Sequence, residues 1–111
     1  MRKIIFLFLL LNFNFIYTQN SFTISGYVQD NSNNELIIGA SVIVKELQIG
    51  TVTNNYGFFS LTLVEGDYDL IFQSLGFEDQ SLNFSLDRNI SVNIFLNAVS
   101  YTHLRAHETN Q

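Results

Sequence analysis

Two histidines near the carboxyl end are the first residues to test for chemistry. His103 and His107 are four positions apart, so a helix would place both imidazoles on one face, where they could bind zinc. The zinc-protease patterns with this spacing also need a glutamate at position 104 or 106, where Leu104 and Ala106 stand. Because the ligand set is incomplete, we expect no metal site.

Asp67 and Asp69 form the second candidate, because they flank Tyr68 and would share one face of a strand. Paired carboxylates serve hydrolysis or calcium binding. The alternation of this segment turns the face toward water, which favours a solvated strand end. Serines and threonines are plentiful, but no histidine within the domain could activate one, and glycines occur singly, unlike a phosphate-binding cluster. We expect no catalytic residue, no cofactor and no enzyme activity.

Three aromatic residues are a candidate contact surface. Tyr27, Tyr56 and Phe58 could form an exposed patch for a sugar or a protein. Aromatic residues near turns more often cover a core, and the sequence favours this second interpretation.

The composition indicates one small folded domain. The 111 residues are 47% hydrophobic and 14% charged, which is too apolar for a disordered chain. There is no cysteine, so disulfides, thiolate nucleophiles and cysteine-bound zinc are excluded. The formal net charge is −5, and an acidic surface disfavours nucleic acid and anionic lipid as partners.

The first residues have the pattern of an export signal. Two basic residues precede an apolar run over residues 4–11, and a mixed stretch follows to residue 19. Asn12 and Asn14 interrupt the apolar stretch, so it is a weak transmembrane helix. We expect residues 1–19 to be a signal peptide, with an uncleaved anchor as the alternative.

The remaining chain alternates between apolar and polar residues in short segments. Strands are expected over residues 24–29, 40–45, 51–52, 59–63, 68–73, 81–86 and 90–96. Seven strands at intervals of about 8 to 12 residues, without a helical period, are typical of an antiparallel sandwich or a small barrel. The expected fold class is therefore all-β.

The segment 50–61 is expected to be a β-hairpin. Asn54 can accept a hydrogen bond from the backbone two residues on, and Gly57 can adopt the positive φ that a type I turn with a bulge requires. Apolar residues recur at every second position after the turn.

Four motifs in this order resemble the carboxypeptidase-regulatory-like domain. They are I-x-G-x-V-x-D at residues 24–30, G-A-x-V at 39–42, G-T-x-T-N-x-x-G-x-F at 50–59 and S-x-G-F at 74–77. The resemblance covers about residues 22–97. It implies a seven-stranded, transthyretin-like or immunoglobulin-like sandwich that carries no peptidase site.

The resemblance gives the motif residues structural roles. It places two glycines at tight backbone positions, an asparagine at the turn, a phenylalanine in the core and a glycine at a corner. The full set is Gly26, Gly39, Gly50, Thr53, Asn54, Gly57, Phe59 and Gly76. The chain departs from the family pattern in two ways: Ile37 and Ile38 replace the usual proline before Gly39, and Asn54 replaces a frequent aspartate.

A domain of this family directly after a signal peptide is similar to the amino-terminal extension of TonB-dependent outer-membrane receptors. The resemblance implies an exported, non-catalytic module in the periplasm or at the outer membrane. Its partners would be periplasmic proteins or the rest of a receptor chain, with membrane contact only through a barrel that this chain lacks. The alternatives are an accessory domain of a secreted metallopeptidase and a glycan-binding surface protein.

The expected organisation has three parts: a signal peptide over residues 1–19, the sandwich over 20–97 and a tail over 98–111. The tail contains both histidines, and the alternation stops before it begins. It fits no part of the family pattern and resembles translated sequencing-adaptor text. We expect it to be an artefact.

Overall fold

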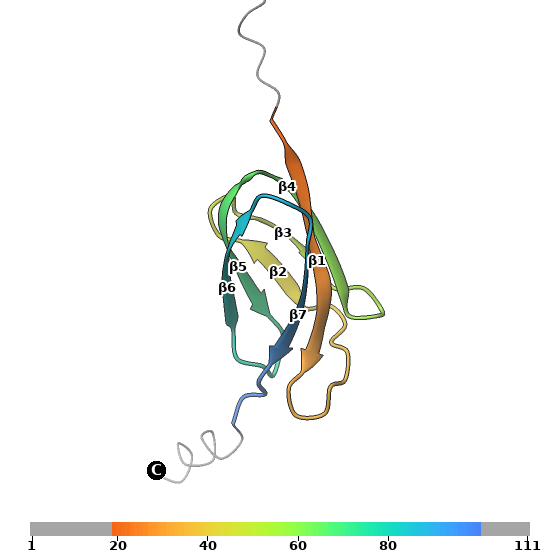
Figure 1. Ribbon diagram of the computed structural model, residues 1–111. Helices are drawn as coiled ribbons and strands as arrows, with labels where there is room; N and C mark the ends of the chain where they lie inside the picture. Colours follow the sequence, from red (N-terminus) through yellow and green to blue (C-terminus); the bar gives the residue numbers. More distant parts are fainter. Residues whose placement is uncertain (1–18, 101–111) are drawn as a thin grey trace, which may run out of the picture.

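The computed structural model describes residues 19–100, which form seven β-strands (Figure 1). The strands are β1 (Ser21–Asp30), β2 (Ser41–Val44), β3 (Ile49–Val52), β4 (Phe58–Val64), β5 (Gly66–Gln73), β6 (Gln80–Leu86) and β7 (Ile90–Leu96). Among these residues there is no helix of the length and hydropathy needed to cross a membrane.

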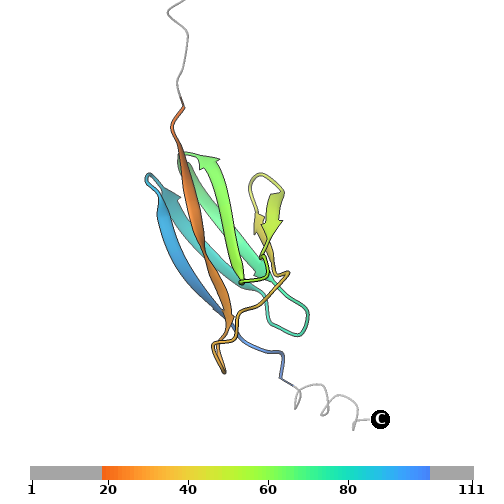
Figure 2. The same ribbon diagram turned by 90° about the vertical axis from the view of Figure 1, so that its right-hand side faces the viewer.

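The strands form two sheets that pack face to face (Figures 1 and 2). One sheet has the order β4-β1-β7 and the other the order β3-β2-β5-β6. The all-β sandwich expected from the sequence is confirmed. Four strand pairings are antiparallel, and β1 pairs with β7 in parallel. Because the first and last strands run in the same direction, residues 19 and 100 lie at opposite ends of the domain (Figure 1).

The expected hairpin over residues 50–61 is wrong. β3 pairs with β2 in the four-stranded sheet, whereas β4 pairs with β1 in the three-stranded sheet. The physical reason lies in the bonds of the connecting residues. Thr53, directly after β3, forms backbone hydrogen bonds with residues 39 and 40, which precede β2. Four residues later, the Gly57 carbonyl accepts a hydrogen bond from the Val28 N–H of β1 at 2.8 Å. The chain therefore crosses between the sheets instead of folding back on itself.

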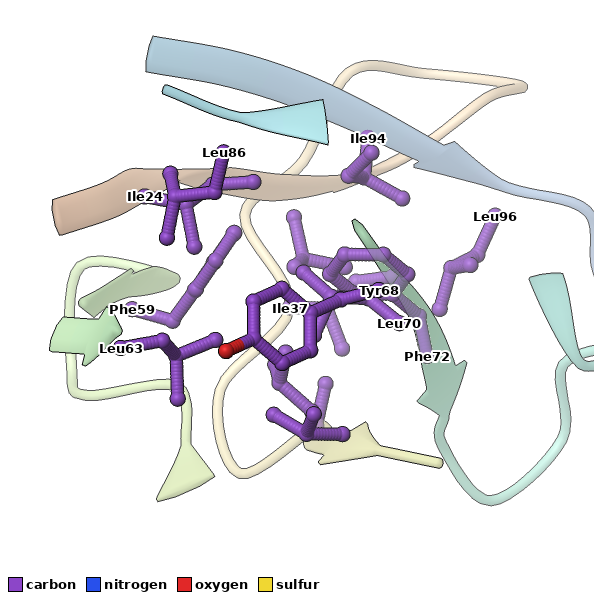
Figure 3. Packing of buried hydrophobic residues seen from close by; sticks show 14 residues of the cluster. Ile24, Ile37, Phe59, Leu63, Tyr68, Leu70, Phe72, Leu86, Ile94 and Leu96 are labelled. Carbon is purple, nitrogen blue, oxygen red and sulfur yellow. The ribbon is translucent and has the colours of Figure 1, made fainter. Parts of the chain in front are cut away.

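The core lies between the sheets and is built from alternating residues of every strand except β3, together with two residues of the segment before β2 (Figure 3). On β5, Tyr68, Leu70 and Phe72 all face inward and are buried, as the alternation predicts. The rings of Phe59 and Phe72 meet edge to face across the core, with centroids 5.5 Å apart. Burying each large apolar side chain contributes about 1.5–3 kcal/mol before chain entropy is counted. The fourteen buried apolar residues are Ile24, Val28, Ile37, Ala40, Val42, Val44, Phe59, Leu63, Tyr68, Leu70, Phe72, Leu86, Ile94 and Leu96.

The residues after β7 turn against the corner that follows β5. The Glu78 N–H donates to the Asn97 carbonyl at 2.8 Å, and the Val99 N–H donates to the Gly76 carbonyl at 2.8 Å. Phe77 and Ala98 form an isolated antiparallel bridge. These bonds tie the end of β7 to the segment that enters β6.

Gly26 occupies the middle of β1, where strands lie on both sides. It pairs with Phe59 of β4 and Val92 of β7. A Cβ atom at this position would overlap the carbonyl oxygen of Val92 and lie 2.7 Å from its carbonyl carbon. Only glycine leaves the backbone of β7 in place.

We predict that Gly26→Ala destabilises the fold by at least about 2 kcal/mol, because the added methyl group meets backbone rather than a flexible side chain. Urea unfolding followed by far-ultraviolet circular dichroism measures the change. Gly66→Ala is the matched control, because the nearest atom to its Cβ would be the Tyr68 hydroxyl oxygen at 3.5 Å. Equal unfolding midpoints for the two variants would contradict the assignment.

Candidate functional site

The buried hydroxyl group of Thr53 joins the end of β3 to the segment before β2. Thr53 is 3% exposed and is the one buried polar residue among residues 19–100. Its Oγ1 donates to the Ile37 carbonyl at 2.6 Å and accepts from the Ala40 N–H at 2.8 Å. Its backbone N–H donates to the Ala40 carbonyl at 2.9 Å, and its carbonyl accepts from the Gly39 N–H at 3.0 Å. We call this set of bonds the Thr53 clamp.

Asn54 and Gly57 form the turn that follows the clamp. The Asn54 Oδ1 accepts from the Tyr56 N–H at 2.9 Å and the Phe58 N–H at 3.1 Å. The Asn54 carbonyl accepts from the Gly57 N–H at 2.9 Å, and Gly57 has a φ of 69°. Only the oxygen of the Asn54 amide is used in these bonds, so an aspartate could accept them too. The departure from the family pattern at this position therefore preserves the turn.

Gly57 also packs closely against β1. The Val28 carbonyl accepts from the Ile37 N–H at 2.9 Å, which places both chain segments beside the turn. A Cβ atom at Gly57 would lie 3.0 Å from the Leu36 Cβ and 3.1 Å from the Val28 oxygen. Gly57 thus meets two requirements, a positive φ and a narrow space.

The remaining motif residues are spread over the domain. Gly39 belongs to the Thr53 clamp and has a φ of 74°, and Gly76 lies in the corner after β5 with a φ of 86°. In β3, a Cβ atom at Gly50 would lie 2.5 Å from the Val42 oxygen. Phe59 is in the core. The structure thus brings Gly39, Thr53, Asn54 and Gly57 together and places Gly26, Gly50, Phe59 and Gly76 elsewhere.

Asp67 and Asp69 share the outer face of β5, and both bind side chains of β6. The Ser85 hydroxyl donates to Asp67 Oδ1 at 2.6 Å, and the Asn83 amide donates to Asp69 Oδ1 at 2.7 Å. Within residues 19–100 there is no group of three or more acidic, histidine or cysteine side chains that could hold a metal ion. The two carboxylates therefore act as cross-strand hydrogen-bond acceptors. His103 and His107 lie outside the described residues.

Two of the three candidate aromatic residues contact each other on the outer face of the three-stranded sheet. The rings of Tyr27 and Phe58 meet edge to face with centroids 5.3 Å apart. Tyr56 belongs to the turn and is 70% exposed. Phe95 lies on the same sheet face as Tyr27, because Tyr27 pairs with Asn93 and Gln29 with Phe95. The sequence could have identified Phe95 as an outward residue, because it alternates with Ile94 and Leu96, which are buried.

Comparison with known proteins connects these features to a family. The family model described as the CarboxypepD_reg-like domain matches residues 24–104. The TonB-dependent receptor SusC of Bacteroides thetaiotaomicron is 34% identical over 68 residues, which are 61% of this chain and 7% of the receptor. The match therefore spans less than a tenth of that relative.

Two solved structures share the fold at low sequence identity. A mutant of catechol 1,2-dioxygenase from Acinetobacter radioresistens superposes with a TM-score of 0.63 at 11% identity, over 76% of this chain and 54% of the enzyme. A chain of the type II Cohesin-X-Dockerin complex from Acetivibrio cellulolyticus superposes with a TM-score of 0.58 at 17% identity, over 68% of this chain and 57% of that chain. These likenesses support the sandwich fold alone.

We predict that Thr53→Val lowers the free energy of unfolding by about 1–3 kcal/mol, because it leaves the Ala40 N–H and the Ile37 carbonyl without a partner in a buried place. Valine has nearly the same shape, so a packing loss contributes little. Thr53→Ser keeps the hydroxyl group and should lose less stability. Thermal and urea unfolding measure both variants, and a serine variant less stable than the valine variant would contradict the role of the hydroxyl group.

A second pair of variants separates the two requirements at Gly57. Gly39→Ala should lower the free energy of unfolding by about 1 kcal/mol, because alanine must adopt the positive φ of this position. Its Cβ would have no atom within 4 Å, so no steric overlap is added. Gly57→Ala should lower the free energy of unfolding clearly more. Its Cβ would crowd the Leu36 Cβ and the Val28 oxygen, in addition to the positive φ that alanine must adopt. Chemical unfolding of the two proteins gives the difference. If the two costs were equal, the narrow space beside Gly57 would have no energetic effect.

Proposed function

Since the chain belongs to the CarboxypepD_reg-like domain family, we propose that it is a non-catalytic, exported module of a TonB-dependent outer-membrane receptor. In this proposal the domain lies in the periplasm at the amino-terminal end of the receptor and contributes to transport through protein contacts. The observation that carries the proposal is the 34% identity to SusC over 68 residues.

The use of the polar side chains supports a non-catalytic role. The Thr53 hydroxyl group is saturated by backbone groups, and Asp67 and Asp69 are held by β6. Among the described residues, no buried side-chain nitrogen or oxygen lacks a hydrogen-bond partner. Catalytic groups more often carry perturbed or unsatisfied polar atoms. Contacts with other proteins are therefore the better assignment for this domain.

The path of the chain supports a position within a longer polypeptide. Because β1 and β7 are parallel neighbours, the chain enters the domain at one end and leaves it at the other (Figure 1). A module with this geometry can stand in line between an export signal and a following domain. A following domain would then lie roughly the length of β1, about 30 Å for ten residues, from residue 19.

We predict that the genomic reading frame, determined from unassembled DNA, continues from this domain into a plug domain and a large outer-membrane barrel. The family membership and the similarity to SusC are the reasons for expecting this continuation. A long read across the locus is the measurement.

A stop codon soon after Leu96 would contradict the proposal. The zinc-ligand motifs of a metallopeptidase downstream would contradict it as well, because they would identify an accessory domain of a secreted enzyme. Cell fractionation with a periplasmic marker provides the control for export, and recovery of the chain with the cytoplasmic fraction would be a further contradiction.

A further inference from the structure

The first and last strands of the domain form one parallel ladder. β1 pairs with β7 over seven residue pairs, which run from Ile24 to Asp30 of β1, and we call these pairs the β1–β7 ladder. Because the strands are parallel, the start of β1 and the end of β7 lie at opposite ends of the ladder (Figure 1). A pull on the two ends of the domain would therefore slide β1 and β7 past each other, and all seven pairs would resist the sliding together.

The ladder decides whether β7 can be pulled away. β7 is the edge of the β4-β1-β7 sheet, so among the described residues its only strand partner is β1. β1 also pairs with β4, over seven further residue pairs, and is therefore held on both sides. Extraction of β7 by a pull thus requires the rupture of the β1–β7 ladder.

Two asparagine side chains extend the ladder beyond its last residue pairs. At one end, the Asn89 Oδ1 accepts from the Thr23 N–H at 2.9 Å, one residue before the first pair. At the other end, the Asn31 side-chain amide donates to the Asn97 Oδ1 at 2.9 Å, one residue past the last pair. The Asn31 N–H also donates to the Leu96 carbonyl at 2.9 Å. Strand ends are where pairing frays most easily, so these bonds protect the ladder at both ends.

The inner face of the ladder is closed to water. Four inward side chains of the two strands are each at most 6% exposed (Figure 3), namely Ile24, Val28, Ile94 and Leu96. A backbone hydrogen bond that water cannot reach has no substitute partner while it breaks, which raises the cost of breaking it. The core thus strengthens the ladder against sliding.

The chain is also bonded where it enters and leaves the domain. The Asn20 carbonyl accepts from the Glu65 N–H at 2.8 Å, and residues 97 and 99 bond to the corner after β5. These few bonds lie outside the ladder and share the load with no other residue pair of a sheet. The ladder is therefore the longest barrier that a lengthwise pull meets.

We propose that the domain is a load-bearing link, in which the β1–β7 ladder transmits a lengthwise pull without unfolding. The ladder bears the load in shear, and the side chains of Asn31 and Asn89 keep its two ends closed. Forced unfolding is governed by the unfolding rate rather than by equilibrium stability, so the direction of the pull sets the force. The inference goes beyond the receptor assignment and does not depend on it, because the geometry of the domain alone carries it.

The test pulls single molecules of the chain, after export and purification, in two directions. The chain contains no cysteine, so introduced cysteines are unique attachment points. Ser21→Cys with Ser100→Cys loads the ladder in shear, whereas Ser21→Cys with Arg88→Cys loads it from the end at which β1 and β7 both begin. The second pull opens the ladder one pair at a time, so the unfolding force should be lower by roughly twofold or more.

Equilibrium unfolding in urea is the control for this comparison. The three positions are exposed, so both proteins should have the same midpoint. A difference in unfolding force between them then belongs to the direction of the pull.

A matched pair of variants tests the ends of the ladder in the shear direction. Asn89→Ala removes the bond to the Thr23 N–H and should lower the unfolding force. Asn93→Ala makes the same change at an exposed asparagine in the middle of the ladder, and it should lower the force less.

Equal unfolding forces in the two directions would overturn the proposal. Equal forces for Asn89→Ala and Asn93→Ala would overturn the part that it assigns to the asparagine side chains. Neither result would affect the receptor assignment, and a stop codon soon after Leu96 would not affect the ladder, so the two failures are distinguishable.

Discussion

The fold depends on one buried hydroxyl group. Thr53 Oγ1 binds the Ala40 N–H and the Ile37 carbonyl where no water reaches them, so two backbone groups of an irregular segment are satisfied by one side chain. The segment over residues 37–40 is therefore held against the domain, with Ile37 and Ala40 buried and Ile38 and Gly39 exposed. With this segment in place, β2 lies beside β3, and the chain must leave β3 toward the other sheet. Asn54 and Gly57 then direct it onto β1.

The crossing after Thr53 determines how the other sheet is arranged. Because β4 is delivered to one side of β1, the last strand can pair only with the other side, and β7 does so in parallel. β1 thus becomes a central strand, and Gly26 must admit the backbone of β7 at close range. The same arrangement puts residues 19 and 100 at opposite ends of the domain. The residues after β7 bond to the segment before β6, so these two edge strands are joined at that end.

The sequence predicts which residues face the core, but not which strands are neighbours. The period of two identifies Tyr68, Leu70 and Phe72 as inward residues, and Asn54 with Gly57 identifies the turn. Alternation carries no information about which strand pairs with which. The sequence therefore predicts that the two strands flanking the turn pair with each other, although in the structure they belong to different sheets. The sequence also does not predict that Thr53 is buried, because Thr51 has the same side chain and is half exposed. That β6 is an edge emerges only from the topology.

The negative net charge of the domain can compensate for its edge strands, which contain no charged residue and no proline. Edges without charge or proline would normally promote pairing between copies. Here nine carboxylates against two basic residues over 19–100 give the described part of the chain a net negative charge, and repulsion between like charges opposes the approach of two copies. Repulsion of this kind does not oppose a neutral or basic partner. Charge outside the four edge strands, rather than charge on them, can therefore oppose pairing between copies.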